Sequence, residues 1–217
     1  QYTYKEDISI ERARQYLNLP QEAFIVTAFG KFRNWEEIRM VLGVFCKWNK
    51  KNKLLLAPRF YPFSRYNSYG RNILKRWASR IGYYLAIPLL NRMFNLQAGA
   101  NDELIDNCDL PYYIAASDVI FIQRKDILNS GNVPLGFLYH KVVMGPKVGN
   151  IGELLSETGN PTFDPDNKQD ILRALKEARR LATWGQGEVN YAYGMENMSI
   201  RKVGQAYAQT YKQASNG

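Results

Sequence analysis

The stretch that decides the fold is DVIFIQRKDILNSGNVPLGFLYHKVVMG, Asp118–Gly145. An apolar run, Asp118–Gln123, leads through a loop containing Gly131 to a helical pattern at residues 130–139, and a second apolar run occupies Val142–Gly145. Short apolar runs rich in Val and Ile predict buried strands. A strand, a helix and another strand at this spacing form the unit from which parallel sheets are built.

The same alternation extends in both directions from this unit. Phe24–Gly30 predicts a strand, and Asn34–Trp48 predicts a helix with Asn34 as its N-cap. Further strands are expected at residues 53–58, 94–97 and 162–164, and further helices at residues 71–87, 110–117, 148–155, 167–183 and 189–212. We therefore expect one Rossmann-like α/β domain over residues 1–217, with a parallel sheet that has helices on both faces.

Several motifs occur in a fixed order: FGKFRNWEEI at Phe29–Ile38, DVIFIQ at Asp118–Gln123, HKVVMG at His140–Gly145 and GNIGE at Gly149–Glu153. In order and spacing they resemble motifs of the C-terminal half of group 1, or family 4, GT-B glycosyltransferases, which read fGrirpyKgi, aDvfvlPS, GkPVia and GgipE. Tyr4 and Arg14 lie in a segment similar to the link between the two domains of these enzymes. The resemblance extends over nearly the whole chain.

The resemblance implies that the chain is the C-terminal, nucleotide-sugar-binding domain of such an enzyme, a hexosyltransferase. It implies a nucleotide-diphosphate sugar as donor substrate, no cofactor, and transfer of a hexose to a polysaccharide or lipid-linked glycan. The acceptor would be held by an N-terminal domain outside this chain, toward which a C-terminal helix, residues 189–217, is expected to pack. The isolated domain is therefore expected to be inactive.

Ligands of such folds bind at the carboxyl ends of the strands, where loops run into helix N-termini. The backbone N–H groups of Ser130, Gly131 and Asn132, at the start of a helix, are expected to bind the diphosphate. Lys31 and Arg33, on the loop after the first strand, are expected to bind the same phosphates. Both would stabilise the leaving group as its negative charge develops.

The predicted donor site departs from the family pattern. Many members carry two glutamates eight positions apart that bind the donor sugar and the ribose, whereas these positions hold Ile127 and Leu135 here. The lysine of the yKg turn is replaced by Glu36, whose charge repels a diphosphate. Asn129 or Glu153 is expected to contact the sugar instead. The alternative is a non-catalytic nucleotide- or membrane-binding domain that kept the fold and lost the donor-site glutamates.

Three titratable residues near these loops also have structural interpretations. Glu153 either accepts hydrogen bonds from donor hydroxyls or simply favours the start of a helix. His140 stands at a family glycine position, and without a positioned partner a histidine is more often structural than catalytic. Asp118 is interpreted as a cap at the start of a strand.

The charge of the chain is uneven. Its 29 Lys and Arg residues exceed its 20 Asp and Glu residues, and the net charge of +9 favours phosphate-bearing partners. The segment from Ile38 to Asn101 holds twelve basic residues and no acidic residue. Outside it, 17 basic and 20 acidic residues leave a net charge of −3. The function of this basic segment is therefore a separate question.

Two kinds of anionic surface suit the basic segment. Arg71, Lys75 and Arg76 lie near Trp and Tyr residues on an amphipathic pattern, which is typical of helices at an anionic membrane surface. Nucleic acid would use the same basic and aromatic residues, but no recognised nucleic-acid module accompanies them, so we expect no nucleic-acid partner. The apolar stripe of the same pattern, Ile73, Trp77, Ile81 and Tyr84, is interpreted as a cover for the sheet.

Cys46 and Cys108 are the only cysteines, too few for a disulfide scaffold or a Cys-rich zinc site, and they fit a reducing compartment. No metal is expected, on the premise that the chain has no Asp-x-Asp pair. No signal peptide is visible, and the longest apolar run, Tyr83–Leu90, is far shorter than the roughly 18 residues of a membrane-spanning helix. We therefore expect a cytoplasmic protein, peripheral on the inner face of the membrane.

Overall fold

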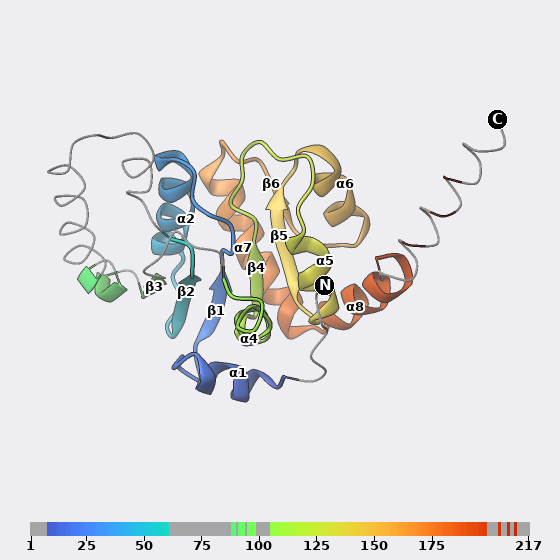
Figure 1. Cartoon of the computed structure of the whole chain (residues 1–217). Coiled ribbons are helices and arrows are strands. Elements are labelled where there is room, and N and C mark those ends of the chain that lie inside the picture. Colours follow the sequence, from blue (N-terminus) through green and yellow to red (C-terminus); the bar gives the residue numbers. More distant parts are fainter. Residues whose placement is uncertain are drawn as a thin grey trace, which may run out of the picture.

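Six strands lie side by side in the described part of the computed structural model, which comprises residues 8–60, 88–89, 91–93, 95–98, 105–198, 204, 208 and 211. They form one sheet in the order β3-β2-β1-β4-β5-β6, and each neighbouring pair is parallel (Figure 1). The strands are β1 (Phe24–Thr27), β2 (Lys53–Ala57), β3 (Leu96–Ala98), β4 (Val119–Phe121), β5 (Val142–Pro146) and β6 (Thr162–Phe163). The predicted α/β class and parallel sheet are confirmed.

Helices cover both faces of the sheet, as predicted (Figure 1). The described helices are α1 (Ile10–Tyr16), α2 (Trp35–Lys47), α4 (Leu110–Ala116), α5 (Asn132–Leu138), α6 (Gly149–Glu157), α7 (Lys168–Thr183) and α8 (Gln186–Asn197). Helices α2 and α7 pack on one face, where Val41 and Leu175 share an apolar cluster with Leu55 and Met144. Helices α1, α4, α5 and α6 pack on the other face, around Ile120 and its neighbours.

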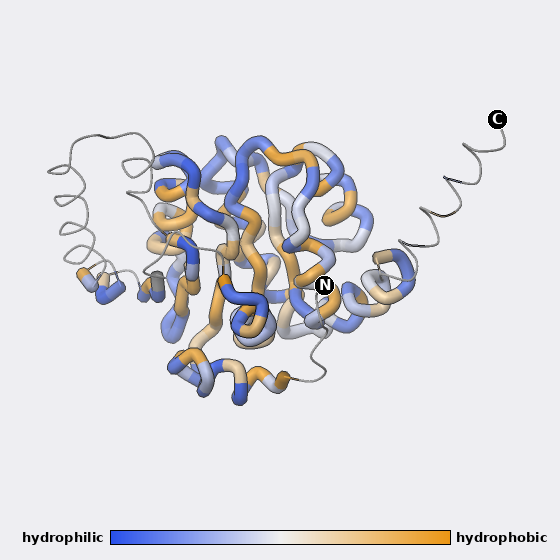
Figure 2. Tube along the Cα trace, in the orientation of Figure 1, coloured by the Kyte–Doolittle hydropathy of each residue, from blue (hydrophilic) through white to orange (hydrophobic). Residues whose placement is uncertain are grey.

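The strands are apolar on both sides because both sides are covered. Along β2, Leu55 and Ala57 belong to the cluster under α2 and α7, whereas Leu54 and Leu56 belong to a cluster on the opposite face. Parallel strands covered on both faces are continuous apolar runs rather than alternating ones. Figure 2 shows this as hydrophobic colour along the strands and hydrophilic colour on many of the outer loops.

Helix α2 begins where its N-cap was predicted. Asn34 has extended backbone, and its Oδ1 accepts a hydrogen bond from the Glu37 N–H at 2.9 Å. Glu36 and Glu37 lie in the first turn, where the partial positive charge of the helix end favours carboxylates. The cap therefore fixes the point at which the loop after β1 becomes a helix.

Helix α1 was not predicted. Ser9 caps it, its Oγ accepting from the Arg12 N–H at 3.2 Å. The buried Arg14 of α1 forms an ion pair with Asp118, with 2.9 Å between Nη2 and Oδ2. The same Asp118 oxygen accepts the Ile25 N–H at 2.7 Å, so this carboxylate joins α1, the start of β1 and the start of β4. The interpretation of Asp118 as a structural cap is confirmed.

Helix α8 packs against the turn that holds His140. A Cβ at Gly187 would lie 2.1 Å from the His140 carbonyl oxygen, so the helix approaches as closely as only glycine allows. The His140 ring stacks on Tyr191, with 3.9 Å between ring centroids, and its Nδ1 lies 2.9 Å from Glu188 Oε1. His140 also has a φ of 56°, the left-handed region that favours glycine. His140 thus does have a positioned partner, Glu188, and its contacts join α8 to the turn before β5, as its structural interpretation requires.

Several predicted elements differ in their bounds or lie outside the described residues. The helix predicted at 130–139 is α5, and the strand predicted at 94–97 is β3. The helix predicted at 71–87, with Arg71, Lys75 and Arg76, lies outside the described residues, as does most of the chain after α8. Of the helices that the structure describes, none combines the length and apolarity needed to cross a bilayer.

Candidate functional site

The carboxyl ends of the parallel strands lie at one edge of the sheet, where a hollow of about 490 Å³ opens. Its lining comes from the first turn of α2 and from the loops after β4, β5 and β6: Glu36, Lys125, Asp126, Lys147, Val148, Asp164, Pro165 and Asp166. The strand order changes direction between β1 and β4. In sheets of this kind ligands bind at the carboxyl side of that switch point.

The loops after β1 and β4 are bound to each other across the switch point. The buried Gln123 donates from Nε2 to the Gly30 carbonyl, and a Cβ at Gly30 would lie 2.6 Å from that nitrogen, so any larger residue there would displace the Gln123 side chain. Arg124 Nη1 lies 3.0 Å from Oε1 of Glu37, and both side chains are largely buried. Oε2 of Glu37 also accepts the Arg33 N–H at 2.8 Å. The loop that carries Arg33 is therefore fixed to the end of β4.

The loop after β4 is also packed against the start of α6. Gly149 has a φ of 53°, and a Cβ there would lie 2.8 Å from the carbonyl oxygen of Ile127. Both facts favour glycine at this position. Asn150 Nδ2 donates to Asn129 Oδ1 at 3.2 Å. The loops after β1, β4 and β5 therefore form one connected unit.

The residues predicted to bind phosphate lie on two of these loops. Lys31 is half-buried and Arg33 is exposed, both between β1 and α2. Gly131 is the N-cap of α5 and Asn132 is its first residue. The Asn132 N–H is bonded to Ser130 Oγ at 3.2 Å, so a phosphate on this amide would have to displace the hydroxyl.

The two residues predicted to contact the sugar are both exposed. Asn129 lies on the loop after β4 and is held by Asn150. Glu153 is in the second turn of α6, four residues beyond Gly149, and the first turn of this helix holds no acidic residue. The helix-start interpretation of Glu153 is therefore wrong, and hydroxyl binding by Glu153 stays a prediction.

The two family glutamate positions are occupied by apolar packing. Ile127 and Leu135 are both half-buried against the cluster that contains Val133 and Ile151. A carboxylate at either position would be partly removed from water among apolar side chains, which is unfavourable without a partner. In this chain both positions therefore contribute to apolar packing rather than to a polar site.

The hollow is lined by four carboxylates and two lysines, and sequence reasoning missed all of these charged residues except Glu36. Lys125 Nζ lies 2.5 Å from Asp166 Oδ1 and 3.4 Å from Glu36 Oε2. The hydrogen bond to Asp166 raises the pKa of Lys125. Lys125 and Lys147 follow predicted strands within a few residues, which is the signal that would have found them.

The premise that the chain has no Asp-x-Asp pair is wrong, because Asp164 and Asp166 form one after β6. Asp164 Oδ1 accepts the Asp166 N–H at 2.9 Å, and Asp166 is paired with Lys125. Among the residues that the structure describes, no group of three or more His, Cys, Asp or Glu side chains is placed to hold a metal ion. Asp166 is thus engaged by Lys125, whereas within the described residues only one carboxylate oxygen of Asp164 is bonded, to the Asp166 N–H.

The strand order and the helices on both faces of the sheet define a Rossmann-like domain. No protein-family model matches the sequence, and no curated protein matches it in sequence. Solved structures of glycosyltransferases match its fold. Sucrose-phosphate synthase from Thermosynechococcus elongatus is 16% identical with a TM-score of 0.69, over 96% of this chain and 51% of that chain.

Two further solved structures show which half of these enzymes is matched. Alr3699/HepE from Anabaena, in complex with UDP-glucose, is 13% identical with a TM-score of 0.67, over 94% of this chain and 52% of that chain. The C-terminal domain of LpcC, a group 1 glycosyltransferase from Francisella tularensis, is 11% identical with a TM-score of 0.61, over 89% of this chain and 100% of that domain. The chain thus spans about half of the longer proteins, and its fold is that of the C-terminal half of GT-B glycosyltransferases.

Proposed function

We propose that the chain is the donor-binding domain of a glycosyltransferase that transfers a hexose from a nucleotide-diphosphate sugar. The observation that carries the proposal is the junction of the loops after β1, β4 and β5 beside the switch point of the sheet. Ligands of this fold class bind at such a junction. The complex of Alr3699/HepE with UDP-glucose supports a nucleotide sugar as the donor.

The diphosphate would bind to the loop after β1 and to the start of α5. The backbone of Arg33 is held by Glu37 while its side chain is exposed, so the guanidinium is presented from a fixed loop. Lys31 lies two residues earlier on the same loop. Together with the amides of Ser130–Asn132, these cations would stabilise the diphosphate as it leaves the sugar.

The ribose and sugar hydroxyls would bind to the carboxylates of the neighbouring hollow. A carboxylate oxygen accepts hydrogen bonds from hydroxyls, and the family glutamate positions here are apolar. Asp126, directly before Ile127, lines the hollow and is exposed. We assign to Asp126 and Asp164 the acceptor role that the family gives to its two glutamates, with Asn129 or Glu153 as a further contact to the sugar.

The acceptor would be a polysaccharide or a lipid-linked glycan held by a separate N-terminal domain, and the C-terminal residues 189–217 would pack toward that domain. A lipid-linked acceptor fits a protein at the cytoplasmic face of a membrane, and Arg71, Lys75 and Arg76 would bind anionic lipid there. Co-sedimentation with phosphatidylserine vesicles should then fall steeply with salt and after these three residues are changed to Glu. Sedimentation that neither change affects would exclude the membrane contact.

The donor site is tested by calorimetric titration of the chain with UDP, GDP and ADP. One of them should bind, and the variant with Lys31→Ala and Arg33→Ala should bind it at least tenfold more weakly. Changing the exposed Lys168 and Lys176 of α7 to Ala gives a variant of equal charge that should bind like the wild type. Absence of binding by all three nucleotides, or equal binding by both variants, would contradict the site.

A non-catalytic binding domain is the second candidate, and the apolar packing of Ile127 and Leu135 favours it. It predicts nucleotide binding without turnover. A turnover assay on the full-length protein, with the N-terminal domain present, distinguishes the two candidates. Donor hydrolysis or sugar transfer supports the enzyme, whereas binding with no release of free nucleotide supports the binding domain.

A further inference from the structure

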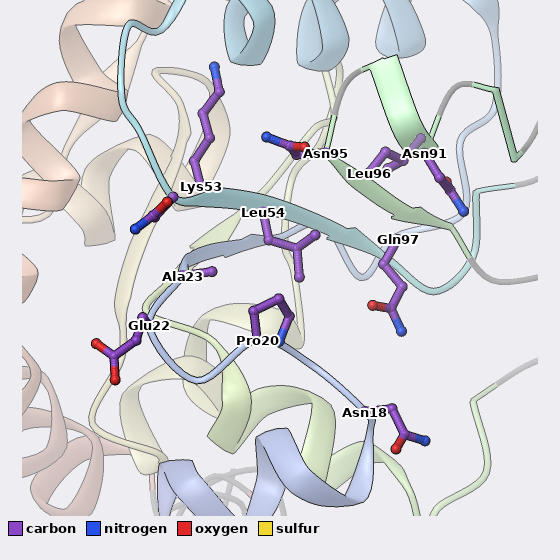
Figure 3. Close-up of a pocket in the computed structure, with 11 residues that line it drawn as sticks. Asn18, Pro20, Glu22, Ala23, Lys53, Leu54, Asn91, Asn95, Leu96 and Gln97 are labelled. Atoms are coloured by element: carbon purple, nitrogen blue, oxygen red, sulfur yellow. The ribbon is translucent and has the colours of Figure 1, made fainter.

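A second hollow, of about 890 Å³, opens at the opposite edge of the sheet (Figure 3). It lies at the amino ends of three neighbouring strands, where Ala23 precedes β1, Asn52 precedes β2 and Asn95 precedes β3. Asn18 and Gln97 add two more carboxamides to its lining. The volume is within the range of about 300–1,000 Å³ that is usual for small-ligand sites.

Three of its carboxamides are presented to solvent by the same backbone conformation. Asn18, Asn52 and Asn95 have φ values of 53°, 52° and 47°. All three are exposed, and within the described residues their side chains make no hydrogen bond. The left-handed backbone favours Gly or Asn at each position. The backbone conformation alone does not explain why all three positions hold Asn, since glycine adopts this conformation at lower cost.

The floor of the hollow is apolar. Figure 3 shows Pro20 and Leu54 directed toward one another in its centre, and Ala23 and Leu96 also line it. A pyranose ring has an apolar face of C–H groups and a rim of hydroxyls that both donate and accept hydrogen bonds. Carboxamides likewise donate and accept. An apolar floor with a rim of carboxamides therefore matches the chemistry of a sugar ring.

Among the residues that the structure describes, the lining of the hollow holds no free cation for a phosphate or a nucleic acid. Its one lysine, Lys53, is turned away from the centre and donates from Nζ to the carbonyls of Phe45 and Trp48 at the end of α2 (Figure 3). Burial lowers the pKa of Lys53. Within the described part of the lining, the only other charged residue is the exposed Glu22. These residues favour an uncharged ligand.

The hollow, at about 890 Å³, is larger than a single sugar ring, and its carboxamides are distributed along the ends of neighbouring strands. Leu55 of β2 is in register with Leu96 of β3, which aligns Asn95 with Leu54, two residues beyond Asn52. From the usual strand spacing and rise, the Cα atoms of Asn52 and Asn95 are on the order of 8 Å apart. We propose that this hollow binds an uncharged oligosaccharide, at the edge of the sheet opposite the donor site.

The left-handed backbone makes a sharp test available. A variant with Asn18→Gly, Asn52→Gly and Asn95→Gly loses three carboxamides and keeps residues that suit the backbone. Wild type and variant are titrated by NMR with maltohexaose, cellohexaose, mannohexaose and chitohexaose, each at millimolar concentration. At least one should shift the side-chain NH₂ signals of these asparagines in the wild type, and the triple variant should bind it at least tenfold more weakly.

Two controls separate this site from the rest of the molecule. Changing Asn49 and Asn107, which are exposed and outside the lining, to Gly should leave oligosaccharide binding unchanged. The variant with Lys31→Ala and Arg33→Ala should also bind the oligosaccharide like the wild type. Failure of the donor site and failure of this second site are therefore distinguishable. Absence of shifts with all four oligosaccharides, or equal binding by the folded triple variant, would overturn the proposal.

Discussion

The stability of the domain should rise with pH above neutrality because of Lys141. Its side chain is buried at the start of β5, and Nζ donates to the Ala115 carbonyl at 2.8 Å. Burial lowers the pKa of Lys141 from 10.5 to about 8, while the Asp118 carboxylate opposes the change and the Arg14 guanidinium adds to it. The folded domain therefore keeps a positive charge in an unfavourable place at neutral pH.

The magnitude follows from the two pKa values of Lys141. The unfolded chain holds the proton up to about pH 10.5, whereas the folded chain loses it near pH 8. Between these values the unfolded state binds more protons, so the free energy of unfolding rises with pH. The full difference corresponds to about 3 kcal/mol, of which roughly 2.5 kcal/mol falls between pH 7 and pH 10.

Urea unfolding of the wild type and of Lys141→Met across this pH range measures the effect. The free energy of unfolding of the wild type should rise relative to the variant by roughly 2.5 kcal/mol from pH 7 to pH 10. Burial raises the pKa of Tyr113 and Tyr139, and the free energy of unfolding therefore falls at high pH. The wild type and Lys141→Met share this loss, so it cancels in the difference between them. Lys176→Met, at an exposed position of α7, is the control. A wild-type minus Lys141→Met difference that stays constant with pH would refute the reasoning.

Three further predictions concern the loops of the donor site, each measured by urea unfolding. Arg124→Leu should lower the free energy of unfolding by about 3 kcal/mol, because it leaves the Glu37 carboxylate buried without its partner. Adding Glu37→Met to Arg124→Leu should restore part of the lost free energy of unfolding. A double variant that is no more stable than Arg124→Leu would contradict a buried ion pair. Asn34→Ala should lower the free energy of unfolding by about 1 kcal/mol, and Asn34→Gly should lower it by only a few tenths of that. Equal losses for the two variants would argue against Asn34 as the N-cap of α2. Gly149→Ala should lower the free energy of unfolding by about 2 kcal/mol, because φ is 53° and the new Cβ would lie 2.8 Å from a backbone carbonyl oxygen. Gly131→Ala, where a Cβ meets no atom within 4 Å, should be close to neutral, and similar losses at both positions would contradict the steric argument.

The sheet could be predicted from the sequence because each of its signals is local. The runs that became β1, β2, β4 and β5 are short, apolar and separated by helical patterns, which is enough to predict parallel strands. Asn34 could be predicted as a cap from its position before the helical pattern of α2. Helix α1 could not, because its seven residues are stabilised by contacts of Ala13 and Arg14 with distant parts of the chain.

The candidate site was predicted only in part because its decisive contacts are long-range. The loops to examine followed from the strand ends, but nothing in the sequence pairs Glu37 with Arg124, which is 87 positions away. Nor does the sequence show that Gln123 closes on Gly30, 93 positions away. These contacts decide which loops are joined to each other, and side-chain packing between sequence-distant segments is not visible in any local pattern.

Net charge proved a poor guide to where a phosphate would bind, because several basic side chains are committed to the fold. Lys53 is bonded to the end of α2, Arg14 to Asp118, Arg124 to Glu37, and Lys141 to a backbone carbonyl. Each is buried or partly buried, and its charge is engaged by partners within the domain. Arg33, in contrast, is exposed on a loop whose backbone is fixed. A count of lysines and arginines treats these two kinds of cation alike, whereas only an exposed cation on a fixed loop can meet a phosphate without breaking a contact that the fold requires.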